Sequence, residues 1–190
     1  MVSTLGFDPR NEGSIPSGTL FLIFSKILKI LYINKMENFT PEQLYNYVLK
    51  YVEKRLGTNG VTTAGQLDNI GKEAFKSEWA GVYPADRLPE LNAKTCKAIY
   101  NADKHDEPGS HWMALYHDKD TGKTYSYDSF GRNLKTDKVY KNVRKSQRLK
   151  LKQSQEFDSE QTETQENCGA RCISWLALAG NLPIEELMKI

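Results

Sequence analysis

Apolar residues recur at helical spacing directly after the segment Thr40–Gln43. Leu44, Val48 and Val52 would share one face of a helix. The preceding Thr-Pro-Glu-Gln segment has the residues of a capping box, and its proline suits the first helical position. Gly57 can adopt the left-handed conformation that ends a helix. The pattern therefore predicts an amphipathic helix that ends at Gly57.

The pattern changes after this helix. A weaker helix is predicted around Leu67–Phe75, and the glycine and prolines of residues 79–94 indicate an irregular packed segment. Three strands are then predicted, at Lys97–Asn101, His111–His117 and Lys123–Asp128. The turn residues of Asp118–Gly122 join the last two strands as a hairpin.

Side chains of the middle strand should alternate between the two faces of the sheet. One face would carry Trp112, Ala114 and Tyr116, and the other Met113 and Leu115. A long helix is predicted from Cys168 to about Ala179, and a short helix from Pro183. This order is typical of an α+β fold, with a small mixed or antiparallel sheet flanked by helices.

Residues 1–35 differ from the rest of the chain. Met1–Gly18 shows no period, and Thr19–Ile33 is apolar but too short to span a bilayer. A membrane-surface helix is one interpretation. We favour the other, a disordered or upstream extension before a domain that begins at Met36. We therefore expect one domain over residues 36–190, with no stable membrane span.

The composition is that of a soluble globular protein, with 39% hydrophobic and 26% charged residues. A net charge of +2 excludes a histone-like packager, and three cysteines indicate a reducing compartment rather than a disulfide framework. The charge is nevertheless segregated: residues 132–152 carry nine basic side chains and one acid, and residues 156–166 carry five acids. The basic run fits a nucleic-acid-binding face or, as we favour from composition, a solvated surface segment.

The candidate chemistry centres on Cys168, at the predicted start of the last helix. A helix N-terminus favours the thiolate, which is the reactive form, and Gly169 permits close backbone approach. Cys172 falls among apolar residues and Cys96 beside a predicted strand, and both are expected in the core. Cysteines four residues apart lack the usual spacing of a zinc site, so no metal is expected.

A reactive thiolate needs a base and an acceptor that orients it. His111 begins one strand of the predicted hairpin and Asp128 ends the other, so antiparallel pairing would place them side by side. The backbone N–H of Cys168 could stabilise an oxyanion together with a side-chain amide. The loop before the cysteine offers three such amides: Gln161, Gln165 and Asn167.

Four segments carry a combined signature: Ala-Ile-Tyr-Asn at 98–101, His-Trp-Met-Ala at 111–114, Tyr-Asp-Ser-Phe-Gly at 127–131 and Asn-Cys-Gly-Ala-Arg-Cys at 167–172. Together they resemble the adenovirus maturation protease family and its relatives in large DNA viruses, virophages and Polinton-type elements. The similarity covers roughly Trp79 to Leu178. The motif order and the 17-residue gap between the histidine and the aspartate fit the adenoviral pattern.

The resemblance implies a papain-like, adenain-like cysteine protease fold with a catalytic triad. In that triad Cys168 is the nucleophile, His111 the general base and acid, and Asp128 the orienting acceptor. The resemblance also implies an oxyanion glutamine. An ungapped match to the adenoviral loop selects Gln161, which we favour, and a shorter loop would select Gln165.

The implied function is that of a viral cysteine endopeptidase that processes capsid or other virion precursors in the host cytoplasm (virus factory) and the virion. No cofactor is required, and DNA bound by residues 132–152 would be an activator. A disulfide-linked peptide activator is not expected, because residues 129–167 contain no cysteine. The alternatives are a SUMO- or ubiquitin-like deconjugating protease, and a non-catalytic DNA-binding or scaffold protein.

Overall fold

The computed structural model describes residues 39–57, 60–153, 159, 161–162 and 164–190. The expected extension over residues 1–35 and the expected domain start at Met36 lie outside this part of the chain. The helices are α2 (Pro41–Leu56), α3 (Ala64–Phe75), α4 (Lys145–Arg148), α5 (Cys168–Leu178) and α6 (Ile184–Leu187). The strands are β1 (Trp79–Pro84), β2 (Lys97–Asn101), β3 (Trp112–Asp118), β4 (Lys123–Tyr127) and β5 (Leu151–Gln153), and the short 3-10 helices are η1 (Lys76–Glu78), η2 (Ala85–Arg87) and η3 (Lys138–Tyr140).

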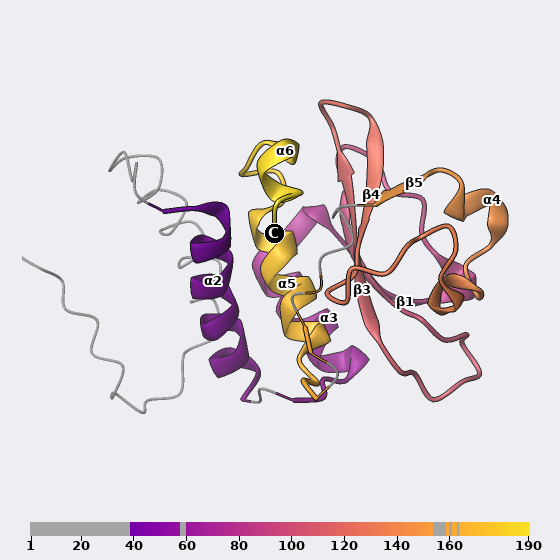
Figure 1. The fold of residues 1–190 in the computed structure, drawn as a ribbon, viewed down its shortest axis with the longest axis horizontal. Coiled ribbons are helices and arrows are strands. Elements are labelled where there is room, and N and C mark those ends of the chain that lie inside the picture. The colour runs from indigo at the N-terminus through magenta and orange to yellow at the C-terminus, as the bar shows by residue number, and fades with distance from the viewer. Residues whose placement is uncertain (1–38, 58–59, 154–158, 160, 163) are drawn as a thin grey trace, which may run out of the picture.

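The sheet has the strand order β1-β2-β3-β4-β5. The three central strands pair antiparallel, and each edge strand pairs parallel with its neighbour. The predicted α+β class with a mixed sheet is therefore confirmed. Helices α2, α3 and α5 lie on one side of the sheet, and the chain that carries α4 lies on the other (Figure 1).

Two hydrophobic clusters fill the spaces on either side of the sheet. The predicted alternation along β3 is confirmed: Ala114 and Tyr116 belong to the cluster on the helical side, and Met113 and Leu115 to the cluster on the opposite side. On the helical side, the buried Trp175 of α5 stacks on Tyr127 at a ring-centroid distance of 5.0 Å. This packing fixes α5 against the centre of the sheet.

The first two helices begin with side-chain caps. The capping box predicted at Thr40 is present, and Gly57 ends α2 in the left-handed conformation with φ 68°. α3 begins earlier than predicted because Thr63 and Gln66 form a second capping box. The apolar period gives no sign of this start, since its first buried member is Leu67.

The prediction of an irregular segment over residues 79–94 is wrong for its first part, which forms β1. Gly81 has φ 127° and follows a register shift that interrupts the regular pairing with β2. Pro84 is tolerated because β1 is an edge strand that pairs on one side only. Among the described residues, no helix is both long and apolar enough to cross a membrane.

Candidate active site

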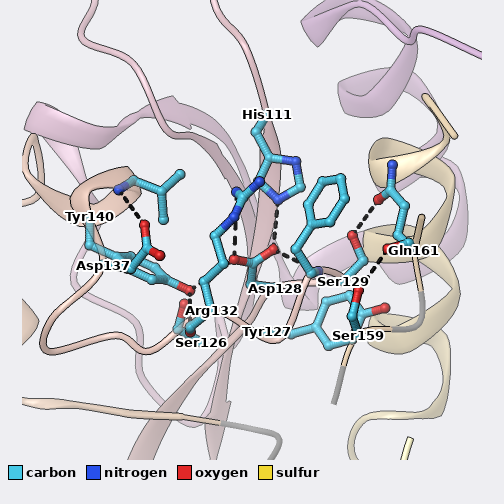
Figure 2. A network of polar contacts seen from close by, with 12 residues as sticks. His111, Ser126, Tyr127, Asp128, Ser129, Arg132, Asp137, Tyr140, Ser159 and Gln161 are labelled. Atoms are coloured by element: carbon cyan, nitrogen blue, oxygen red, sulfur yellow. Dashed lines mark hydrogen bonds and ion pairs between the residues drawn. The ribbon is translucent and has the colours of Figure 1, made fainter. Parts of the chain in front are cut away.

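The histidine and the aspartate are brought together by the β3–β4 hairpin. His111 directly precedes β3 and Asp128 directly follows β4, and the strands pair with Ala114 opposite Tyr127. Nε2 of His111 lies 2.7 Å from Oδ1 of Asp128, and both residues are buried, with 6% and 2% exposed (Figure 2). A buried pair at this distance orients the imidazole firmly.

Asp128 is held from several directions. The backbone N–H of Phe130 donates to Oδ1 at 3.0 Å, the Tyr140 hydroxyl donates to Oδ2 at 3.3 Å, and the Arg132 guanidinium lies 3.9 Å from Oδ2. Burial alone would raise the pKa of Asp128. The hydrogen bond and charge of His111, together with the backbone N–H of Phe130, nevertheless hold this pKa below its usual value. The carboxyl group is therefore ionised at neutral pH.

Cys168 is the first residue of α5 and is 9% exposed. Burial would raise the pKa of this thiol, but the hydrogen bond and charge of His111 and the backbone N–H groups of Trp112 and Gly169 lower it. Burial likewise opposes a charged His111, yet its bonds to Asp128 and Cys168 raise the pKa of the imidazole. Because Nε2 bonds to the aspartate, Nδ1 is the ring nitrogen available to the cysteine.

Gly169 lets the start of α5 lie against the loop before α3. A Cβ at this position would lie 2.0 Å from Oγ1 of Thr62 and 3.0 Å from a methyl group of Leu67. The Trp112 indole donates to the backbone carbonyl of Thr62 at 2.9 Å, which ties the same loop to β3. The absence of a side chain at Gly169 therefore permits the close packing that positions the neighbouring Cys168.

Gln161 is a buried residue of the loop that precedes α5. Its Oε1 accepts from the Ser129 hydroxyl at 2.6 Å, its backbone N–H donates to the Ser129 carbonyl at 3.0 Å, and its carbonyl accepts from the Ser159 hydroxyl (Figure 2). Its Nε2 donates to the backbone carbonyl of Gln165. Ser129 follows Asp128 directly, so this loop is attached to the strand-borne half of the site.

The other two amides of the loop point elsewhere. The Gln165 side chain is exposed, and its Oε1 accepts from the Thr162 N–H at 3.1 Å and from Arg171 at 3.3 Å. The Asn167 side chain donates to Glu53 at 2.7 Å and accepts from Arg171 at 2.9 Å. Both amides thus serve contacts to neighbouring segments, whereas Gln161 lies beside the residue after Asp128.

An open cleft of about 1120 Å³ contains the candidate residues. Its lining includes four of the five residues singled out from the sequence: His111, Cys168, Gln161 and Gln165. Asp128 is not in the lining and lies behind the histidine. Within the described ranges, no group of three His, Cys, Asp or Glu side chains is arranged to hold a metal ion.

One pair of residues beside the histidine is missed by sequence reasoning. The Phe130 ring lies 5.0 Å from the His111 ring, and the Arg132 guanidinium covers the same phenyl ring at 4.3 Å. These contacts form a wall of the cleft next to the imidazole. The Ser-Phe-Gly turn after the aspartate marks their position in the sequence, but nothing in it indicates the stacking.

Comparisons with known proteins give one short similarity. The chain is 38% identical over 47 residues to a protein of Acanthamoeba polyphaga mimivirus named "putative thiol protease". The match covers 25% of this chain and 16% of the mimivirus protein, so it spans a small part of that relative. No family model matches the chain, and no solved structure matches it. The similarity suggests a viral thiol protease.

Proposed function

We propose that the chain is a viral cysteine endopeptidase in which Cys168, His111 and Asp128 form the catalytic triad. The observation that carries the proposal is the buried 2.7 Å bond between the imidazole and the carboxylate, in contact with a cleft that the cysteine also lines. The lowered pKa of Cys168 and the raised pKa of His111 favour a thiolate–imidazolium pair. Such a pair is a ready nucleophile.

The reaction follows from these positions. The thiolate of Cys168 attacks the scissile carbonyl carbon, and the carbonyl oxygen gains the negative charge of the tetrahedral intermediate. The imidazolium of His111 gives its Nδ1 proton to the leaving amine as the C–N bond breaks, which leaves a thioester. The neutral imidazole then takes a proton from water, whose oxygen attacks the thioester carbon. The C–S bond breaks, the acid product leaves, and the thiolate–imidazolium pair is restored.

Gln161 is the proposed side-chain donor to the oxyanion, together with the backbone N–H of Cys168. It is buried in the cleft and fixed through Ser129, whereas Gln165 is exposed and bonded to Thr162 and Arg171. In the conformation described, Nε2 of Gln161 donates to the Gln165 carbonyl, so the oxyanion would replace that carbonyl as acceptor. Gln165 is the second candidate.

The proposed substrates are capsid or other virion precursor proteins. We propose that the chain has an adenain-like fold and cleaves these precursors in the host cytoplasm or in the virion. The short similarity to the mimivirus protein supports the viral thiol protease part of this proposal, and the substrate class follows from the resemblance to the adenovirus maturation protease family. DNA is a proposed activator through residues 132–152. Of the nine basic side chains there, only Arg132 takes part in a salt bridge among the described residues, so the others are open to a polyanion.

The test is to incubate the full chain with the capsid precursor of the same genome and to identify products by mass spectrometry. We expect discrete cuts that iodoacetamide abolishes, and faster cleavage when duplex DNA is added. Ubiquitin and SUMO fusions serve as parallel substrates. Cleavage of these fusions with an intact capsid precursor would favour a deconjugating enzyme, and cleavage of none would contradict the proposal.

A further inference from the structure

Arg171 is a buried cation on α5 that takes no part in the proposed triad. Only 6% of its surface is exposed, and it lies about one helical turn after Cys168. Its Nε donates to Oδ1 of Asn167 at 2.9 Å, and a terminal guanidinium nitrogen donates to Oε1 of Gln165 at 3.3 Å. A buried guanidinium is costly unless such bonds satisfy it, so these partners help to hold it in place.

The bond to Asn167 changes how α5 begins. An asparagine at the N-cap usually accepts the N–H of the second or third helical residue. Here the Asn167 side chain makes no such cap, because Arg171 occupies its oxygen and Glu53 of α2 accepts from its nitrogen at 2.7 Å. Asn167 therefore links the start of α5 to α2 and to Arg171 instead of capping the helix.

The bond to Gln165 reaches the proposed oxyanion donor. The side chain of Gln165 accepts from Arg171, and its backbone carbonyl accepts from Nε2 of Gln161. One series of contacts thus runs from α2 through Asn167 and Arg171 to Gln165 and on to Gln161. It joins the residue before the nucleophile to the loop that carries the glutamine.

We propose that Arg171 is a positioning residue, which holds Gln165 and Asn167 so that the Gln161 amide and the Cys168 N–H point at the same oxyanion. The proposal rests on the proposed peptidase function. In this proposal Arg171 serves the stabilisation of the transition state and not the formation of the thiolate. The contacts of Arg171 are to residues of the loop before Cys168, whereas the thiolate is paired with His111 beside β3.

The experiment compares Arg171→Gln and Arg171→Lys with the full wild-type chain on a peptide substrate that the wild type cleaves. We expect kcat to fall about 10- to 100-fold in Arg171→Gln with KM within about twofold, because an oxyanion donor acts in the transition state. The pH profile of Cys168 alkylation by iodoacetamide should stay unchanged. Arg171→Lys, which keeps the charge but lacks the planar fork of guanidinium donors, should give an intermediate kcat.

The matched control is Arg55→Gln, which breaks the 3.1 Å ion pair with Glu73 away from the cleft lining and should leave kcat unchanged. If Arg171→Gln does not fold, Asn167→Ala replaces it in the experiment. We again expect a lower kcat and an unchanged pH profile of Cys168 alkylation. An unchanged kcat, or a joint loss of kcat and alkylation, overturns the proposal. A wild-type chain that cleaves no substrate contradicts the peptidase function instead.

Discussion

The two halves of the candidate site are held by different kinds of structure. His111 and Asp128 flank paired strands, so backbone hydrogen bonds between β3 and β4 set their separation. Gln161 lies in a loop whose position depends on side-chain bonds to Ser129 and to the Gln165 backbone. Cys168 stands between the halves, at the end of a helix that packs on the sheet.

This difference separates two tasks. Strand pairing can shift only in whole-residue steps, so the strand half is a rigid source of an oriented base. The loop half can move by smaller amounts because each of its bonds can lengthen or exchange its acceptor. We therefore expect the strand half to govern the charge state of the thiol and the loop half to govern the stabilisation of the intermediate. The predictions below separate these roles.

The largest effect is expected from the nucleophile and its base. Cys168→Ala and His111→Ala should each lower kcat by about 10⁵-fold or more, and the double variant should lose no more than either one. Cys96→Ala, a buried cysteine outside the cleft lining, is the control and should retain activity. Additive losses, measured by single-turnover peptide cleavage, would show that the two residues act independently.

The strand half alone is tested by Asp128→Asn. We expect kcat to fall about 10²- to 10⁴-fold, because the imidazole loses its orienting carboxylate. In the wild type the ion pair forms above the lowered pKa of Cys168 and is lost as pH rises through the raised pKa of His111. Without the carboxylate the pKa of His111 falls, so the alkaline limb of the activity profile should move to lower pH. An unmoved limb would contradict the assignment.

The loop half is tested by Gln161→Ala and Gln165→Ala. The two variants make the same substitution at a buried and at an exposed position of one loop. Gln161→Ala should lower kcat about 10²-fold while the alkylation profile of Cys168 stays unchanged. Gln165→Ala removes one partner of Arg171 but keeps its bond to Asn167 and the backbone carbonyl that accepts from Gln161, so its effect should be below about tenfold. The reverse order of kcat values would assign the oxyanion donor to Gln165.

The smallest effect is expected from the packing of α5 against the loop before α3. Gly169→Ala would force a methyl group against Thr62, and we expect a loss of about 1–3 kcal/mol in the free energy of unfolding. Gly65→Ala in α3 meets open space and should be neutral or slightly stabilising. Urea denaturation of both variants gives the comparison. Equal stability of the two would show that the close approach at Gly169 carries no cost.

The sequence predicts the strand half better than the loop half for a physical reason. The period of two along β3 and the turn residues of the hairpin are local signals, and they position His111 and Asp128 together. β1 was not predicted because a register shift at Gly81 and a terminal proline interrupt the strand pattern. The second capping box at Thr63 is also local, but it lies ahead of the apolar period.

The loop contacts could not be predicted because they join distant parts of the chain. The bond between Glu53 and Asn167 spans 114 residues, and nothing near either residue specifies the other. The choice between Gln161 and Gln165 depends on which amide is buried beside Ser129, which is a tertiary property. The burial of Arg171 among these partners likewise follows from packing, since a charged residue in a helix is ordinarily expected at the surface.

The central claim is that the Cys168 thiolate, paired with His111, hydrolyses peptide bonds. The most direct test is mass spectrometry of a proteome-derived peptide library after incubation with the full wild-type chain and with the Cys168→Ala variant. We expect the wild type to produce new peptide termini that share one sequence preference, and we expect the variant to produce none. The same termini with both proteins, or none with either, would contradict it.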